Sequence, residues 1–219
     1  MYPLDVYRYS YWELGGLGAP ILDDNGRPTR KEGMYKIDHW ITPEQTALII
    51  MDPWDDMPDD NLNEIATEII CMKILPLAEA AARVGHPVYI MTNDPDTVEY
   101  SKHLDIGLLQ LERNNQADIL YHSDNDGFIS ALVSSNINRV IYTGFHSNSC
   151  VLNRPSGIVA AHNAGLTTYL VPEASAAVER KDTWQTGAVH KLVCEMVLSF
   201  GQSYLIHYND LMKAMADGR

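Results

Sequence analysis

The chain has 219 residues, of which 46% are hydrophobic and 21% are charged. This length and composition fit one globular domain with a substantial core and exclude a disordered protein. With a net charge of −13 and only 16 Lys and Arg residues, the chain is not expected to bind nucleic acid, because nucleic-acid binders neutralise phosphates with these side chains.

The first 44 residues differ in kind from the rest. They are rich in Tyr, Gly, Pro and charged residues, contain Trp12 and Trp40, show no clear period and lack the features of a signal peptide. No later stretch approaches the ~20 consecutive apolar residues of a membrane span. We therefore expect a cytoplasmic protein, and the aromatic residues of this segment favour a homodimer or homotetramer. In it, residues 1–44 form an arm over the domain of residues 45–219 or over a neighbouring subunit.

Five short apolar runs follow the arm: ALIIMD (47–52), VYIMT (88–92), DILY (118–121), RVIYTG (139–144) and TTYLV (167–171). Almost continuous runs of this kind are typical of strands covered on both faces. Segments with helical spacing lie between or after them, at 62–84, 126–136, 156–164 and 185–200. The alternation predicts a parallel sheet with helices on both faces, a three-layer α/β/α domain.

The helical segments give further expectations. The apolar stripe of residues 62–84 consists of Leu62, Ile65, Ile69 and Met72. Cys71 and Cys194 fall within such stripes and are expected in the core. Three widely spaced cysteines without a CxxC pair indicate neither a disulfide framework nor a zinc site.

Three reactive residue types stand where strands end. Asp52 closes the first run, His122 follows the third, and Cys150 follows the fourth after a polar turn. Ligands of open α/β sheets bind at the carboxyl ends of the strands, so these groups outline a reaction site. A helix beginning at Cys150 would lower the pKa of its thiol, and Asp52 would be the base. The structural alternatives are a core cysteine and a capping aspartate.

Three stretches resemble one known family in their order and spacing. Its first strand ends in an acid, as in ALIIMDPWDDM. Its nucleophile turn resembles TGFHSNSCV, and its next strand with an acidic-Ala motif resembles GLTTYLVPEASAA. The similarity covers residues 44–180 and points to the isochorismatase-like cysteine hydrolases, which include nicotinamidases, N-carbamoylsarcosine amidases and ureide or biuret hydrolases. It implies a mostly parallel six-stranded sheet and hydrolysis of a C–N bond in a small amide or ureide.

The resemblance also implies a role for each residue of the site. Cys150 would attack the carbonyl carbon of a small-molecule substrate. Asp52 would take the thiol proton and hand it to the leaving amine. The backbone N–H groups of Cys150 and His146 would hold the oxyanion, with a cis peptide bond between Phe145 and His146.

The lysine of the family's catalytic triad is missing. Its position, six residues before a Phe, is occupied by His122 in HSDNDGF. A lysine is always charged near neutral pH, whereas a histidine with an ordinary pKa of ~6.5 is charged only when protonated. His122 is therefore either a functional substitute for the lysine or an ordinary residue in a site without activity. In the second case the protein would bind a small molecule or act as a structural subunit. Lys102 could also reach in from a loop.

Three further residues are candidates for substrate binding. Trp54 stands where the family has D-x-Q, and it either stacks on the substrate or packs in the core. Asn148 belongs to the polar turn before the cysteine. In NRPSG, Pro155 favours a regular helix that begins near Arg154. The Arg154 side chain would either meet a substrate carboxylate or stay solvated.

The sequence predicts no metal and no cofactor. Asp94, Asp96 and His103 follow the second run without the D-x-H spacing of metal-binding family members. A nucleotide-binding glycine motif is absent, and so is the G-x-S-x-G turn of serine hydrolases.

Overall fold

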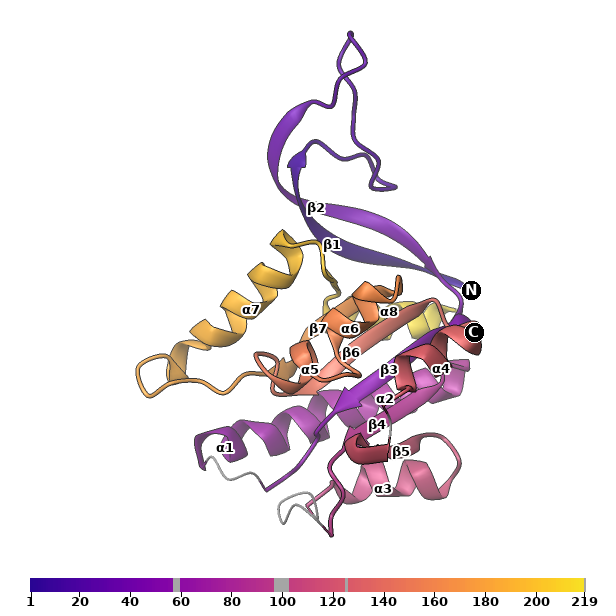
Figure 1. Ribbon diagram of the computed structural model, residues 1–219, viewed down its shortest axis with the longest axis vertical. Helices are drawn as coiled ribbons and strands as arrows, with labels where there is room; N and C mark the ends of the chain where they lie inside the picture. Colours follow the sequence, from indigo (N-terminus) through magenta and orange to yellow (C-terminus); the bar gives the residue numbers. More distant parts are fainter. Residues whose placement is uncertain (57–59, 97–102, 125, 219) are drawn as a thin grey trace.

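All five apolar runs form strands of one sheet in the computed structural model (Figure 1), which describes every residue except 57–59, 97–102, 125 and 219. The strands are β1 (Tyr2–Trp12), β2 (Arg30–Ile41), β3 (Thr46–Met51), β4 (Val88–Thr92), β5 (Asp118–Tyr121), β6 (Arg139–Phe145), β7 (Thr167–Ala176) and β8 (Tyr204–Leu205). Their order in the sheet is β2-β1-β8-β7-β6-β3-β4-β5.

The strands from β8 to β5 run parallel to one another, as the sequence predicts. β3 lies between β6 and β4, and all six of its residues are buried. Leu48 and Ile50 face one core cluster, whereas Ala47 and Ile49 face the other. A strand buried on both faces must be apolar at every position, which explains the continuous run.

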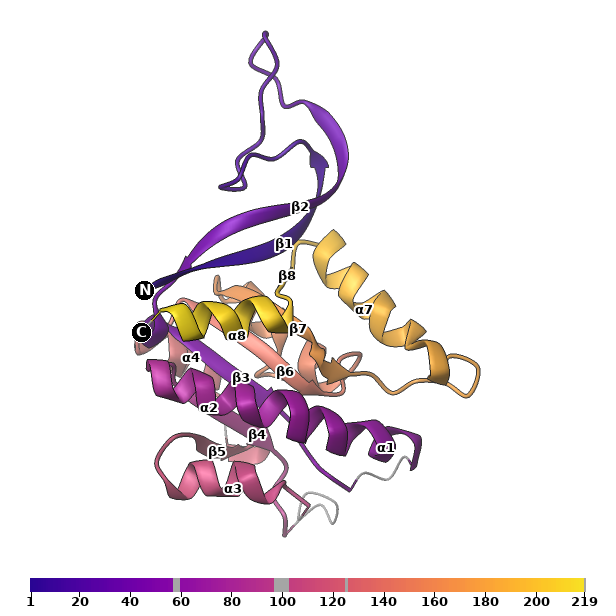
Figure 2. The same ribbon diagram turned by 180° about the vertical axis from the view of Figure 1, so that it is seen from behind.

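The N-terminal arm extends this sheet, so the sheet has eight strands and not six. β1 and β2 form an antiparallel hairpin, and β1 pairs with β8. The Tyr2 hydroxyl donates to Nε2 of His86 at 2.7 Å, because Nδ1 of that ring donates to the Thr46 carbonyl at 2.7 Å. The base of the hairpin is thus joined to the core, while residues 13–29 project from the body (Figures 1 and 2).

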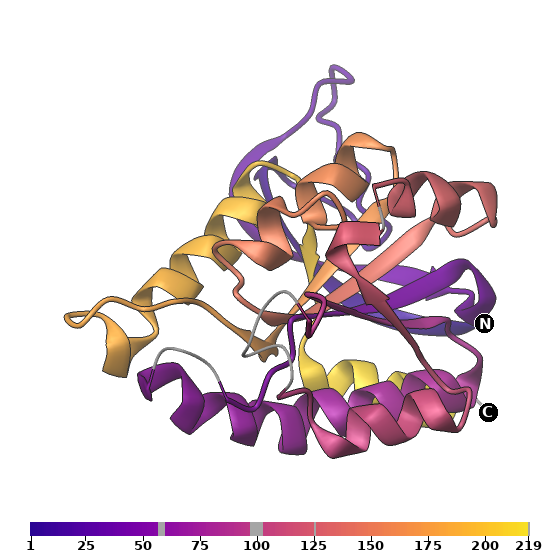
Figure 3. The same ribbon diagram turned by 60° about the horizontal axis from the view of Figure 1, so that its bottom comes forward.

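Helices cover both faces of the sheet. They are α1 (Asp60–Ile69), α2 (Leu75–Val84), α3 (Ile106–Arg113), α4 (Phe128–Ser134), α5 (Cys150–Asn153), α6 (Ile158–Asn163), α7 (Ala188–Ser199) and α8 (Tyr208–Asp217). Figure 3 shows α1, α2, α3 and α8 on one side of the sheet and α4, α5, α6 and α7 on the other. This is the expected three-layer arrangement.

Within the segment 62–84, the buried residues differ from the predicted apolar stripe. A π-helical turn at Ile70–Ile74 separates α1 from α2, just before Pro76, whose ring cannot fit a regular helix interior. The wider turn buries Ile70 and Ile74 and leaves Met72 64% exposed. The core positions predicted for Met72 and Cys71 are therefore wrong, because both are exposed. Cys194 is buried as expected.

Candidate active site

Asp52 directly follows β3 and is completely buried. Its backbone N–H donates to the Met91 carbonyl at 2.8 Å, so the chain stays paired with β4. Its φ of 46° lies in the left-handed region, which aspartate tolerates better than most residues with a side chain. The sheet thus holds a carboxylate at the carboxyl end of its central strand.

Cys150 is the first residue of α5, after the turn that follows β6. Gly144, opposite Met51 in the neighbouring strand, has φ 101°, and a Cβ there would lie 2.1 Å from the Met51 carbonyl oxygen. The peptide bond between Phe145 and His146 is cis. The N–H groups of Ser149 and Val151 both donate to the His146 carbonyl, at 2.9 and 3.1 Å. The turn therefore closes tightly around the cysteine.

His122 stands in a 3₁₀ turn directly after β5. Its Nε2 lies 2.8 Å from Oδ1 of Asp52, and its side chain is 9% exposed. The Asp52 carboxylate also acts on the Cys150 thiol, whose pKa it raises. The structure thus brings together the three residues that the sequence placed at the strand ends.

The pKa of the Cys150 thiol is raised above its ordinary value. Burial is the largest cause, the negative charge of Asp52 adds to it, and the nearby Arg154 guanidinium opposes both. The lower pKa expected from a helix N-terminus is not found, because burial and the charge of Asp52 raise the pKa; α5 itself has only four residues. A protonated thiol beside a carboxylate suits general-base activation at the moment of attack.

The prediction of a helix that begins near Arg154 is also wrong. α5 ends at Asn153 and α6 begins at Ile158, so the NRPSG stretch connects two short helices. Arg154 lies in this connection with its Nη2 4.0 Å from Oδ2 of Asp52 and 3.3 Å from Oδ1 of Asn93. Its guanidinium thus faces the buried carboxylate.

Two residues predicted to bind substrate have structural contacts. Trp54 is 3% exposed, belongs to the core and donates from Nε1 to the Thr92 hydroxyl at 2.8 Å, which corresponds to the packing alternative. The amide group of Asn148 bonds with the backbone of Val178 through both of its ends, at 3.3 and 3.1 Å. Asn148 therefore fastens the turn that carries Cys150 to the loop after β7.

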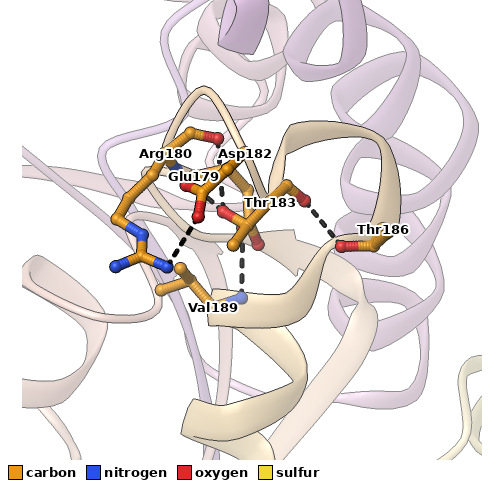
Figure 4. A network of polar contacts seen from close by, with 6 residues as sticks. All are labelled: Glu179, Arg180, Asp182, Thr183, Thr186 and Val189. Atoms are coloured by element: carbon orange, nitrogen blue, oxygen red, sulfur yellow. Dashed lines mark hydrogen bonds and ion pairs between the residues drawn. The ribbon is translucent and has the colours of Figure 1, made fainter.

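That loop is itself fixed to the start of α7 (Figure 4). The Glu179 carboxylate accepts hydrogen bonds from the N–H groups of Val189 and His190, at 3.0 and 2.9 Å. Arg180 pairs with Asp182 at 3.1 Å on the exposed side of the loop. Through Asn148 and this loop, the turn that carries Cys150 is tied to α7.

Sequence reasoning missed a second tie between the turn and α7. The Ser147 hydroxyl lies 2.8 Å from Nδ1 of His190, and Nε2 of His190 donates to the Pro172 carbonyl at 3.1 Å. Burial lowers the pKa of His190, which favours the neutral ring, whose Nδ1 then accepts from the Ser147 hydroxyl. Ser147 and His190 are 43 residues apart, and no local pattern in the sequence connects them.

The stretch after β4, for which the sequence predicted no metal site, is described by the structure only in part. The Asp94 carboxylate accepts the N–H of Asp96 at 2.9 Å, and His103 lies 3.5 Å from Asp56. Among the residues that the structure describes, no three His, Cys, Asp or Glu side chains are grouped so that they could hold a metal ion. Lys102, the alternative source of a positive charge, lies outside the described residues.

No helix within the described part of the chain has the length and apolar character needed to cross a membrane. No protein-family model matches the sequence, and no curated protein matches it either.

Solved structures do match this fold. A cysteine hydrolase from Pseudomonas syringae pv. phaseolicola 1448A is 15% identical with a TM-score of 0.57, covering 83% of this chain and 97% of that one. The nicotinamidase of Staphylococcus aureus is 16% identical with a TM-score of 0.57, covering 75% and 99%. An octameric hydrolase of unknown specificity from Escherichia coli is 13% identical with a TM-score of 0.56, covering 81% and 82%.

Other matching structures are isochorismatase-family proteins, one of them an isochorismatase from Pseudomonas putida KT2440. At these identities the similarity concerns the fold and leaves the substrate open. The chain has the α/β fold of the isochorismatase-like cysteine hydrolases.

Proposed function

We propose that the protein is a hydrolase that cleaves a C–N bond in a small amide, ureide or related compound. The observation that carries this proposal is the fully buried Asp52 carboxylate, which contacts His122 at 2.8 Å and lies beside the Cys150 thiol. A nucleophile, a base and a group that orients the base are the parts that covalent catalysis needs. The fold shared with known cysteine hydrolases supports the same conclusion.

The reaction proceeds in two balanced steps. In the first, Cys150 attacks the substrate carbonyl while its proton passes to Asp52, and the C–N bond breaks as the amine takes that proton. In the second, water attacks the thioester, its proton passes to Asp52, and the sulfur leaves and takes up the proton again. His122 donates to Oδ1 of Asp52 and leaves the other carboxylate oxygen for the proton transfer.

The negative charge that develops on the carbonyl oxygen needs donors. We assign this role to the backbone N–H groups of Cys150 and His146, which belong to the same closed turn. Fixed backbone donors of this kind stabilise a tetrahedral intermediate at little cost of reorganisation.

A screen of small amides and ureides tests the proposal. We expect the wild type to hydrolyse at least one compound and Cys150→Ser to lose at least about 10³-fold in kcat, since the hydroxyl is a far weaker nucleophile at neutral pH. Cys194→Ser, at a buried cysteine on α7, is the matched control and should retain turnover. Equal turnover by Cys150→Ser and the wild type would exclude Cys150 as the nucleophile.

The second candidate function is a catalytically silent protein that binds a small molecule. The raised pKa of Cys150 favours this alternative, because little thiolate is present near neutral pH. Iodoacetamide separates the two. Protection of Cys150 by a compound that is never hydrolysed would support the silent protein.

We also propose that the chain assembles into a homodimer or homotetramer. Three apolar side chains follow one another at helical spacing on α7 and are exposed, namely Leu192 at 54%, Met196 at 40% and Phe200, just past its end, at 67%. Stripes of this kind mark interaction surfaces. Light scattering at micromolar concentration should give a multiple of 24.6 kDa, and a monomer mass would contradict the proposal.

A further inference from the structure

We propose that Arg154 provides the permanent positive charge of the site, the task for which no lysine is present at the strand end. This inference rests on the proposed function, with Asp52 as the base and Cys150 as the nucleophile. It gives Arg154 a positioning and electrostatic role that differs from both sequence alternatives, contact with a substrate carboxylate and a solvated side chain.

The first observation is the unequal environment of the two Asp52 oxygens. Oδ1 accepts a hydrogen bond from His122, whereas Oδ2 is buried and has no hydrogen-bond partner among the described residues. The Arg154 guanidinium faces Oδ2, with its Nη2 at 4.0 Å. A buried carboxylate without a compensating charge is strongly disfavoured, and the Arg154 guanidinium supplies a positive charge on the Oδ2 side of Asp52.

The second observation is the local structure that presents Arg154. Pro155 disfavours helical backbone in the residue before it, and Arg154 is extended, with φ −58° and ψ 156°. The chain then folds back against α5, where a Cβ on Gly157 would lie 2.8 Å from the Val151 carbonyl oxygen. The Ser156 carbonyl accepts a hydrogen bond from the buried Tyr142 hydroxyl at 2.8 Å. The NRPSG stretch is therefore anchored at several points.

The third observation is that Arg154 acts on both partners of the proton transfer. It faces the Asp52 carboxylate, and it opposes the causes that raise the pKa of the Cys150 thiol. As the proton moves from sulfur to Asp52, the negative charge moves from carboxylate to sulfur while the guanidinium stays near both. Unlike His122, an arginine keeps its charge throughout the working pH range.

The test is the pH profile of Cys150 alkylation by iodoacetamide, which needs no substrate. The full chain carries Cys71→Ser to remove an exposed thiol, and peptide mass spectrometry reads each cysteine separately. The charged or titratable groups that face the thiol from the described elements are Asp52, Arg154 and, through Asp52, His122. Arg154→Gln should raise the pH midpoint of Cys150 alkylation by about one unit or more, and at pH values below that midpoint it should slow alkylation about tenfold.

Matched variants make the result specific. Arg154→Lys should restore most of the effect because it keeps the charge, whereas Arg113→Gln, on the exposed end of α3, should change nothing. Iodoacetate and iodoacetamide should be slowed by Arg154→Gln to the same degree. Slowing confined to the anionic reagent would overturn the inference and assign Arg154 to a substrate carboxylate.

Two other results would also overturn it. One is an unchanged midpoint in Arg154→Gln and in a second neutral variant, Arg154→Met. The other is a shift of the midpoint in His122→Gln or Lys102→Gln with none in the Arg154 variants. Alkylation of the buried Cys194 in the same spectra reports unfolding. The proposed function is judged separately, by the turnover of Cys150→Ser.

Discussion

Removal of residues 1–41 should prevent stable folding of the remaining chain. Five side chains of the hairpin are buried to 2% exposure or less, namely Tyr2, Leu4, Val6, Ile37 and Ile41. At about 1.5–3 kcal/mol for each buried side chain, their loss costs on the order of 10 kcal/mol, comparable with the total stability of a typical domain. The buried His86 ring would also lose the hydrogen bond that its Nε2 accepts from the Tyr2 hydroxyl. Circular dichroism and thermal unfolding of the truncated chain measure the effect.

The projecting part of the hairpin provides the control. Replacement of residues 13–29 by a short turn removes exposed side chains such as Leu17, Ile21 and Leu22 and leaves the buried base intact. This variant should keep its secondary structure and its unfolding midpoint within a few degrees of the wild type. A folded, equally stable chain after removal of residues 1–41 would contradict the role of the hairpin in the core.

Asp52→Asn should change turnover and thiol reactivity in opposite directions. Loss of the proposed general base should lower kcat by about 10²–10⁴-fold. The negative charge of Asp52 is one of the causes that raise the pKa of Cys150, so its removal should lower the midpoint of alkylation with pH. Burial, the larger cause, remains, and the midpoint should stay above that of an ordinary thiol.

Measurements of kcat and of Cys150 alkylation between about pH 6 and 10 check both parts of this prediction. Glu44→Gln, at a solvent-exposed acid before β3, is a matched loss of one negative charge and should leave both unchanged. An unchanged kcat in Asp52→Asn would exclude Asp52 as the base. A higher alkylation midpoint would contradict the placement of its charge beside the thiol.

The central sheet was predictable because each of its parallel strands is buried on both faces and reads as an apolar run. The hairpin was not recognised, although Tyr2, Leu4 and Val6 alternate with less buried residues as a half-covered strand requires. Tyr7, Tyr9 and Tyr11, which follow them at odd-numbered positions, hid this period of two. The π-helical turn before Pro76 was also missed, because a shift of helical register depends on backbone geometry and not on the apolar pattern.

The site was predictable as far as it depends on strand ends. Asp52, His122 and Cys150 lie together because parallel strands bring their carboxyl ends to one edge of the sheet. The environment of Arg154 could not be predicted, since it depends on where α5 stops and on how Pro155 turns the chain. The same holds for Trp54, where one aromatic residue at a strand end fits a stacking surface as well as a core.

The covalent intermediate is the most direct test of the central claim, that Cys150 carries the hydrolysis of a C–N bond. A compound found in the amide and ureide screen is mixed with the enzyme, the reaction is quenched in acid during turnover, and the mass of the intact protein is measured. We predict an increase equal to the acyl part of the substrate, which peptide analysis places on Cys150 and which Cys150→Ser lacks. Hydrolysis of that compound at an undiminished rate by Cys150→Ser, or an acyl group found on another residue, would contradict the account.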